Sequence, residues 1–152
     1  MDIQIVPLNN KTYEEVVRIA VEGATGEEKD IRPRLRFYHR YFTAIFDSKV
    51  VGEIGWYQDD GTFAGIALKE NFPYGSNVYW IGHFAVEKDY RGRKIGTKLL
   101  TYLENVVKRL GAKELWVYTS QARGFYEKRG FVFVQKGQID DAWEDFLKKP
   151  LV

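Results

Sequence analysis

Residues 85–100 read AVEKDYRGRKIGTKLL. An apolar strand ends at Ala85-Val86, a short turn rich in basic residues and glycine follows, and a helical pattern of apolar residues resumes at Leu99-Leu100. A strand, a basic turn and a helix start in this order gather free backbone N–H groups and the positive end of a helix dipole around one point. The stretch therefore predicts an anion site, and phosphate is its natural ligand.

The spacing of the glycines decides which phosphate ligand fits. A mononucleotide P-loop needs two glycines five residues apart and then Gly-Lys-Ser/Thr, whereas a dinucleotide-binding turn needs three glycines in the pattern G-x-G-x-x-G. Neither pattern is present here. A solvated basic loop is the plain alternative, and this motif taken alone does not decide between the two.

The segment Arg91–Gly96, RGRKIG, resembles the acyl-CoA signature of the GNAT superfamily of N-acetyltransferases, Arg/Gln-x-x-Gly-x-Gly/Ala. Lys94 stands where the family usually has glycine. The resemblance implies that this position shows its backbone N–H to a pyrophosphate. A lysine does so only if its φ and ψ angles tolerate a Cβ atom. We expect its ammonium group beside the phosphates of the cofactor or in solvent.

A second motif follows in the order that the family requires. Residues 122–131, ARGFYEKRGF, resemble the family's short helix Ala-x-x-Phe/Leu-Tyr-Glu-Lys-x-Gly-Phe. Between the two motifs, apolar residues at steps of three and four predict a helix over 96–110 that stops at Gly111, and residues 115–118 predict a strand. The resemblance covers residues 78–150 well and the first half of the chain loosely.

The resemblance implies a fold of the α/β class, α+β in type. It consists of a single mixed, mostly antiparallel sheet of six to seven strands with about four helices, in one domain over residues 1–152. Two central strands, here 79–86 and 115–118, diverge in this family and make the cofactor slot. Outside the motifs we expect an edge strand over 3–6, a helix from Thr12, a short second helix or a mobile segment within 27–40, and a hairpin over 41–57. Further along we expect a loop over 58–77, a strand over 131–135, a connection over 136–141 and a final strand over 143–149.

The family's site residues carry over position by position. The strand end would hydrogen-bond the pantetheine arm, the turn would bind the pyrophosphate, and Thr119 stands where the family often has an asparagine that contacts the pantetheine. The cofactor-binding candidates are Phe84, Ala85, Val86, Arg91, Gly92, Arg93, Lys94, Ile95, Gly96, Thr97 and Thr119. Thr119 or Ser120 is equally a helix N-cap. Acetyl-CoA is the expected co-substrate, and no metal is expected.

Tyr126 is the catalytic candidate, because the tyrosine of this helix is the family's usual proton donor to the CoA sulfur. Its reference pKa near 10 lies above the roughly 8.5 of a thiol, so the phenol stays protonated at neutral pH and protonates a nascent thiolate. The alternative is a structural aromatic. Phe125 and Tyr126 lie about 100° apart on a helix, and sequence alone does not assign one to the core and the other to the slot.

The general base is left unassigned. The family often places a glutamate or histidine on the cofactor strand, but the corresponding residue here is Trp80. His83 falls on the other face of that strand and is expected to be a hydrogen-bonded sheet histidine. Glu53 and Tyr118 are alternative bases. For each, the base role is the weaker interpretation: Glu53 is more simply a solvated carboxylate and Tyr118 a half-buried tyrosine. A water chain to solvent would serve equally well.

Composition fits a single globular enzyme. The chain has 152 residues, a formal net charge of +2 and no cysteine, which excludes disulfides, thiolate metal sites and cysteine nucleophiles. The small net charge argues against nucleic acid as a partner. The N-terminus lacks the pattern of a signal peptide and no stretch approaches the roughly twenty apolar residues of a membrane span, so we expect no membrane partner and a cytoplasmic location.

The expected activity is direct transfer of an acetyl group from acetyl-CoA to a primary amine of a small molecule or peptide, and homodimer formation stays open. Acceptor specificity is expected in residues 27–40, in 58–77 and in the C-terminal strand pair. We expect the arginines from Arg32 to Arg40 either to attract an acidic acceptor or, by default, to form a solvated basic face. Aromatic residues there line an acceptor pocket or, for most, complete the core; they are Tyr38, Tyr57, Phe63, Phe72, Tyr74, Tyr79 and Trp80. The rival functions are a catalytically silent CoA-binding sensor or scaffold and a nucleic-acid module that uses the basic patches.

Overall fold

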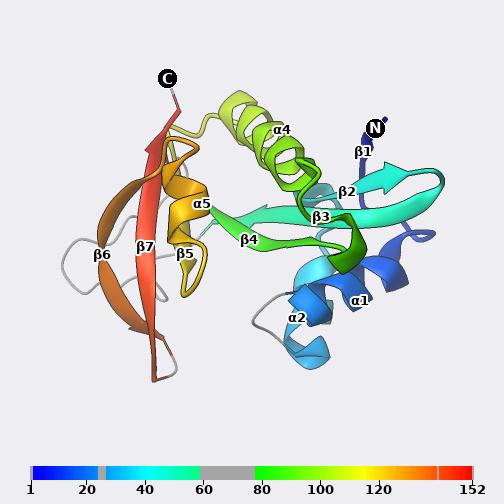
Figure 1. Ribbon diagram of the computed structural model, residues 1–152, viewed down its shortest axis with the longest axis horizontal. Helices are drawn as coiled ribbons and strands as arrows, with labels where there is room; N and C mark the ends of the chain where they lie inside the picture. Colours follow the sequence, from blue (N-terminus) through cyan, green and yellow to red (C-terminus); the bar gives the residue numbers. More distant parts are fainter. Residues whose placement is uncertain (1, 24–26, 59–77, 140, 152) are drawn as a thin grey trace. The chain divides into compact units, whose positions relative to one another are not determined.

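The structure is a computed structural model, and it describes residues 2–23, 27–58, 78–139 and 141–151. Figure 1 shows the path of the chain. The elements are, in order, β1 (Gln4–Pro7), α1 (Tyr13–Gly23), α2 (Glu28–Leu35), the 3₁₀ turn η1 (Tyr38–Arg40), β2 (Tyr41–Phe46), β3 (Lys49–Tyr57), β4 (Val78–Val86), the 3₁₀ turn η2 (Lys88–Tyr90), α4 (Ile95–Arg109), β5 (Glu114–Thr119), α5 (Arg123–Glu127), β6 (Val132–Ile139) and β7 (Ala142–Pro150).

The strands form a seven-stranded sheet in the order β1-β2-β3-β4-β5-β7-β6. Neighbours run antiparallel in the pairs β1–β2, β2–β3, β5–β7 and β6–β7, whereas β4 and β5 run parallel. The ladder between β4 and β5 covers Val78–Trp80 and Glu114–Trp116. The predicted fold class, a mixed and mostly antiparallel sheet with about four helices, is confirmed.

Two compact units divide the chain. Unit 1 consists of Met1–Trp56 and Gly82–Val106, and unit 2 of Tyr57–Ile81 and Val107–Val152. Strands β3 and β4 and helix α4 each contribute residues to both units. The expectation of a single domain over the whole chain stays a prediction.

The β2–β3 hairpin of unit 1 forms as its sequence predicts. Asp47 and Ser48 join the two strands with φ angles of 52° and 64°. Positive φ at both turn residues is typical of a type I′ turn, whose twist matches the twist of the flanking strands. A bulge between Ala44 and Ile45 then shifts the register toward the turn.

Helices cover both faces of the sheet in unit 1. On one face, α1 and α2 bury an apolar cluster that contains Val16, Ala20 and Ile31 together with Tyr41 of β2 and Ala85 of β4. On the other face lies α4, as Figure 1 shows. A Cβ atom built on Gly52 of β3 would meet Leu99 and Ile95, so the absence of a side chain there lets α4 lie close to the strand. The predicted second helix is confirmed as α2.

Gly55 of β3 makes room for a buried ring. It pairs with Tyr41 across the β2–β3 ladder, and a Cβ atom at Gly55 would overlap the Tyr41 ring. Tyr41 is 3% exposed, so its ring has little space into which to move.

We expect Gly55→Ala to destabilise the protein by about 1–3 kcal/mol, because it adds a methyl group to a filled core. Urea unfolding curves measure the change. The matched control is Gly124→Ala, because a Cβ atom there has no neighbour within 4 Å. Equal stability of Gly55→Ala and the parent protein would contradict the packing described here.

Unit 2 contains an antiparallel β5–β7–β6 arrangement around an aromatic core. Trp80, Trp116 and Phe146 are buried together. Strand β6 runs to Ile139 and pairs with β7 as far as Ala142, so the expected connection over 136–141 is wrong for residues 136–139. Within this part of the ladder, Lys136 forms a 2.8 Å ion pair with Asp145 directly opposite. The expected final strand is confirmed as β7.

Candidate active site

The turn between η2 and α4 has an unusual backbone. Gly92 has a φ of 79° and Lys94 a φ of 66°, while Arg93 between them is not among the residues with positive φ. The sign of φ therefore alternates along three residues. Such an alternation is typical of a nest, in which successive N–H groups point toward one side and bind anions. Lys94 thus adopts the left-handed conformation that glycine adopts most easily. The lysine at this position therefore has the backbone conformation that the family's usual glycine would have.

Helix α4 strengthens the positive character of this turn. At its start the Lys98 N–H donates to the Lys94 carbonyl. The first N–H groups of a helix point away from its body at the positive end of the helix dipole. The first turn of the helix contains no acidic residue. The dipole of this 15-residue helix is therefore not opposed by an acidic residue of the helix's own first turn.

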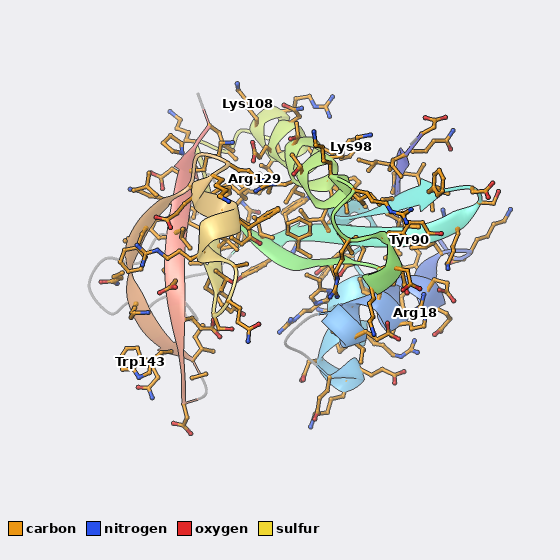
Figure 2. The ribbon with its side chains drawn as sticks, in the orientation of Figure 1. Arg18, Tyr90, Lys98, Lys108, Arg129 and Trp143 are labelled. Carbon is orange, nitrogen blue, oxygen red and sulfur yellow. The ribbon has the colours of Figure 1, made fainter. Side chains whose placement is uncertain are left out.

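Side chains fix the turn from both sides. The Arg91 Nε atom donates a 3.2 Å hydrogen bond to the carbonyl oxygen of Val86, which ties the turn to the end of β4. The Tyr90 ring lies under two cations, Arg93 at 5.1 Å and Lys49 at 5.4 Å from the ring centroid. Figure 2 shows Tyr90 on this turn. Both cations thus lie on the ring of Tyr90, the last residue of η2 before the turn.

Helix α1 holds the start of the same turn through an ion pair that the sequence analysis missed. Arg18 on α1 donates a 2.9 Å bond to Glu87, whose side chain is 11% exposed, and it also pairs with Glu15 and Glu22. The backbone N–H of Glu87 bonds to the carbonyl of Val51 on β3 at 2.8 Å. The spacing of Glu15, Arg18 and Glu22 indicates surface pairs on one helix, but nothing in the sequence indicates the pair with Glu87.

The candidate residues of β4 alternate in burial. Ala85 is buried against the α1/α2 cluster, and Phe84 and Val86 are half-buried. His83 is buried, and its Nε2 atom lies 3.3 Å from Nη1 of Arg34 on α2. A guanidinium only donates, so Nε2 accepts and Nδ1 carries the proton. Burial and the nearby Arg34 lower the pKa of His83 to about 4. The expected hydrogen-bonded sheet histidine is confirmed.

Glu53 of β3 corrects an expectation. Its side chain is 0% exposed, and neither carboxylate oxygen has a hydrogen-bond partner among the described residues. Burial raises the pKa of Glu53 well above its ordinary value. The interpretation of a solvated carboxylate is therefore wrong. Apolar neighbours on both sides of it in KVVGEIGWY were the signal that this strand is buried on both faces.

The second motif lies in unit 2. Tyr126 is the buried member of the Phe125–Tyr126 pair at 6% exposed, and burial raises the pKa of its phenol. The Tyr126 ring contacts Phe125 and Phe131 edge to face at 5.2 Å each. The Thr119 hydroxyl accepts the backbone N–H of Ala122 at 3.0 Å, ahead of α5. The N-cap of α5 is Ala122 and no side chain caps it, so the N-cap role expected as the alternative for Thr119 or Ser120 is wrong; the Thr119 hydroxyl stabilises the turn before the helix instead.

Other sequence candidates occupy the cores of the two units. Trp80 is fully buried and Tyr79 is 5% exposed. The half-buried Tyr118 packs on Phe146, and Tyr38 stacks on Tyr13. Phe63, Phe72 and Tyr74 lie outside the described residues, as does nearly all of the segment 58–77 that we expected to be a loop and to contribute to acceptor specificity.

The described residues contain neither a metal-ligand cluster nor a membrane-spanning helix. Within them, no group of three or more histidine and acidic side chains is placed to hold a metal ion. None of the helices in the described ranges has the length and apolar character needed to cross a bilayer.

Known proteins resemble this chain over most of its length. The model of the Acetyltransferase (GNAT) family matches residues 7–131. N-alpha-acetyltransferase 30 of Schizosaccharomyces pombe is 26% identical over 136 residues, which cover 85% of this chain and 83% of the yeast protein. Ard1 from Thermoplasma volcanium has a TM-score of 0.80 at 18% identity, and covers 100% of this chain and 99% of its own.

A third relative is a chain of the NatC complex, whose structure is described as bound to Gag peptide and CoA. It has a TM-score of 0.78 at 19% identity and covers 100% of both chains. These structural matches show a shared fold. The family model, which matches well over half of the chain, shows more: this protein belongs to the GNAT acetyltransferase family and is an acyltransferase.

Proposed function

We propose that the protein transfers an acetyl group from acetyl-CoA to a primary amine of a small molecule or peptide, in the cytoplasm and by direct transfer. One observation carries the proposal, namely the turn in which φ alternates in sign from Gly92 to Lys94 at the start of α4. A nest of this kind fits a pyrophosphate, because its N–H groups donate to several phosphate oxygens at once. The relatives support the acceptor class, since the yeast protein is named an N-alpha-acetyltransferase.

Residues of this chain would perform three tasks in that reaction. The N–H groups of residues 92–97 bind the pyrophosphate, and Arg91 fixes the turn that presents them. Backbone groups of Phe84–Val86 orient the thioester. The acceptor amine forms the new C–N bond and loses a proton to a base that is not assigned, and the C–S bond breaks. Tyr126 gives its proton to the departing sulfur and regains one from solvent.

Calorimetry and turnover test the proposal together. The protein should bind coenzyme A and release free thiol from acetyl-CoA when an amine or peptide acceptor is present. Failure to bind coenzyme A would overturn the proposal. Binding without turnover across a broad amine and peptide panel would favour the silent sensor instead. A homodimer stays a prediction, which the mass from light scattering decides.

Tyr126→Phe should lower kcat by about 10- to 100-fold, because the variant retains the ring and loses the proton donor. The Kd for coenzyme A should stay within about twofold of the parent value. Tyr79→Phe is the matched control, since it removes a hydroxyl from another buried tyrosine of the same unit, one that bonds to the Leu110 carbonyl, and it should leave kcat unchanged. Equal kcat for Tyr126→Phe and the parent would remove Tyr126 from the chemistry and leave it a structural aromatic.

A further inference from the structure

The turn that joins β4 to α4, residues 87–94, contacts helix α1 at two places. The first contact is made by Arg18, which pairs with Glu15 and Glu22 on α1 itself and with Glu87 at the start of the turn. The side chains of Glu15 and Glu22 are more than half exposed, whereas that of Glu87 is 11% exposed. Exposed pairs within one helix contribute little to stability, and a shielded pair is screened less. Figure 2 shows Arg18 beside the turn that carries Tyr90.

Glu87 is fixed to the sheet as well as to α1. Its backbone N–H donates to the Val51 carbonyl of β3 at 2.8 Å, and its own carbonyl accepts the N–H of Tyr90 at 2.9 Å. Hydrogen bonding to Glu87, ahead of that to Glu15, raises the pKa of Arg18 above its ordinary value, so the contact favours the charged form. Glu87 therefore joins α1, β3 and η2 at the residue where the turn begins.

The end of α1 makes the second contact. Gly23 lies so close to β4 that a Cβ atom built on it would be 2.8 Å from the Ala85 Cβ atom. The same atom would be 3.8 Å from Nη2 of Arg91, so the Arg91 guanidinium lies at the last turn of α1. A helix C-terminus favours a cation, and the last turn of α1 contains no basic residue of its own. Arg91 thus bonds to the Val86 carbonyl through Nε and lies against α1 with the end of its side chain.

Both contacts act on the backbone that the proposed function uses. The N–H groups of residues 92–97 converge only while Gly92 and Lys94 keep their positive φ angles. At Lys94 this conformation costs free energy, because the residue has a Cβ atom. A strained conformation of this kind persists only where the surrounding structure fixes it. The contacts of α1 with Glu87 and Arg91 fix the turn from the side of the helix.

We propose that helix α1 positions the β4–α4 turn for the pyrophosphate of the cofactor. Arg18 does so through Glu87, and Gly23 does so through its close approach to Ala85. Both are positioning residues, since neither is required to touch the ligand. The inference rests on the proposed function and names residues that support the same site. Loss of either contact lets the end of β4 and the turn move, so that the N–H groups no longer converge on the phosphates.

Glu87→Gln is the decisive variant, because two explanations predict opposite results. Coenzyme A is an anion, so removal of a negative charge from the turn should by itself strengthen binding. Loss of the contact with Arg18 should instead raise the Kd for coenzyme A about tenfold in calorimetric titration. Arg18→Gln should raise the Kd by a similar factor. The double variant should bind no more weakly than Arg18→Gln, because both substitutions remove the same contact.

Glu22→Gln is the matched control, because it removes a carboxylate from Arg18 without touching the turn, and its Kd should stay within about twofold of the parent value. Gly23→Ala tests the second contact. Its methyl group would meet Ala85, so the Kd should rise about tenfold even though alanine favours the helix. In Glu87→Gln, Arg18→Gln and Gly23→Ala, 3′-phospho-ADP, which has the pyrophosphate and lacks the pantetheine arm, should lose the same factor as coenzyme A. Melting curves establish beforehand that each variant is folded.

The outcomes separate the two proposals. An unchanged or lower Kd for coenzyme A in Glu87→Gln, or equal losses in Glu22→Gln and Glu87→Gln, would overturn the positioning role of Arg18 and leave acetyl transfer standing. An unchanged Kd in Gly23→Ala would overturn the role of Gly23. A loss for coenzyme A without one for 3′-phospho-ADP would contradict an effect on the pyrophosphate. Absence of coenzyme A binding by the parent protein would overturn the proposed function and this inference with it.

Discussion

Lys94→Val should weaken coenzyme A binding about 100-fold, whereas Lys94→Gly should leave the affinity within about threefold of the parent value. Lys94 has a φ of 66°, a conformation that a β-branched side chain adopts only with strain. Valine would drive the backbone back to negative φ. The alternation of φ that forms the nest, and with it the convergence of N–H groups, would be lost.

Comparison with asparagine separates backbone conformation from charge. Asparagine lacks the ammonium group but tolerates the left-handed region, so Lys94→Asn should bind coenzyme A within about fivefold of the parent protein. Lys94→Gly should also raise stability by about 1 kcal/mol, because it relieves the strain of a Cβ atom at positive φ. Calorimetric titration and thermal melts measure these changes. Equal losses of affinity in all three variants would show that the lysine charge, rather than the backbone, binds the ligand.

Glu53→Gln should make the protein more stable than the parent, by an amount that grows as the pH rises above about 4.5. The ordinary pKa of this carboxyl is 4.5, and burial raises its pKa in the folded protein well above that value. Between the two values the folded state holds a proton that the unfolded chain has lost. The free energy of unfolding of the parent protein therefore falls as the pH rises, at up to about 1.4 kcal/mol per pH unit.

His83 provides a contrast of opposite sign. Its pKa falls from 6.5 to about 4 on folding, so the unfolded chain takes up a proton first and stability is lost as the pH drops from 6.5 toward 4. His83→Gln should remove that loss, while Glu53→Gln should remove the loss at higher pH. Urea unfolding from pH 4 to 8 measures both. A difference between Glu53→Gln and the parent that does not vary with pH would contradict the buried, unpartnered state of Glu53.

The sequence predicted well those local features whose physical cause lies within one short segment. Asp47 and Ser48 make a tight hairpin turn, Gly111 with a φ of 105° ends the long helix, and apolar residues at helical spacing form the buried face of α4. Two motifs in the right order predicted the family and the fold, both of which are confirmed. The connection expected over 136–141 was wrong because the partner strand, rather than local composition, determines how far β6 runs.

The environment of a side chain depends on residues that are far apart in the chain, so the sequence pattern alone does not predict it. Glu53 looked like a surface acid, yet the sheet and helices around it remove it from water. The contrast between Arg32, which has two acidic partners, and Arg34, which contacts a histidine 49 residues away, exists only after folding. The sequence alone thus predicted an anion site in the turn at residues 91–97, because the backbone chemistry of that turn is local. Which arginine has acidic partners and which carboxyl has a raised pKa were decided by tertiary packing, because desolvation and charge pairing depend on every group that the fold brings near.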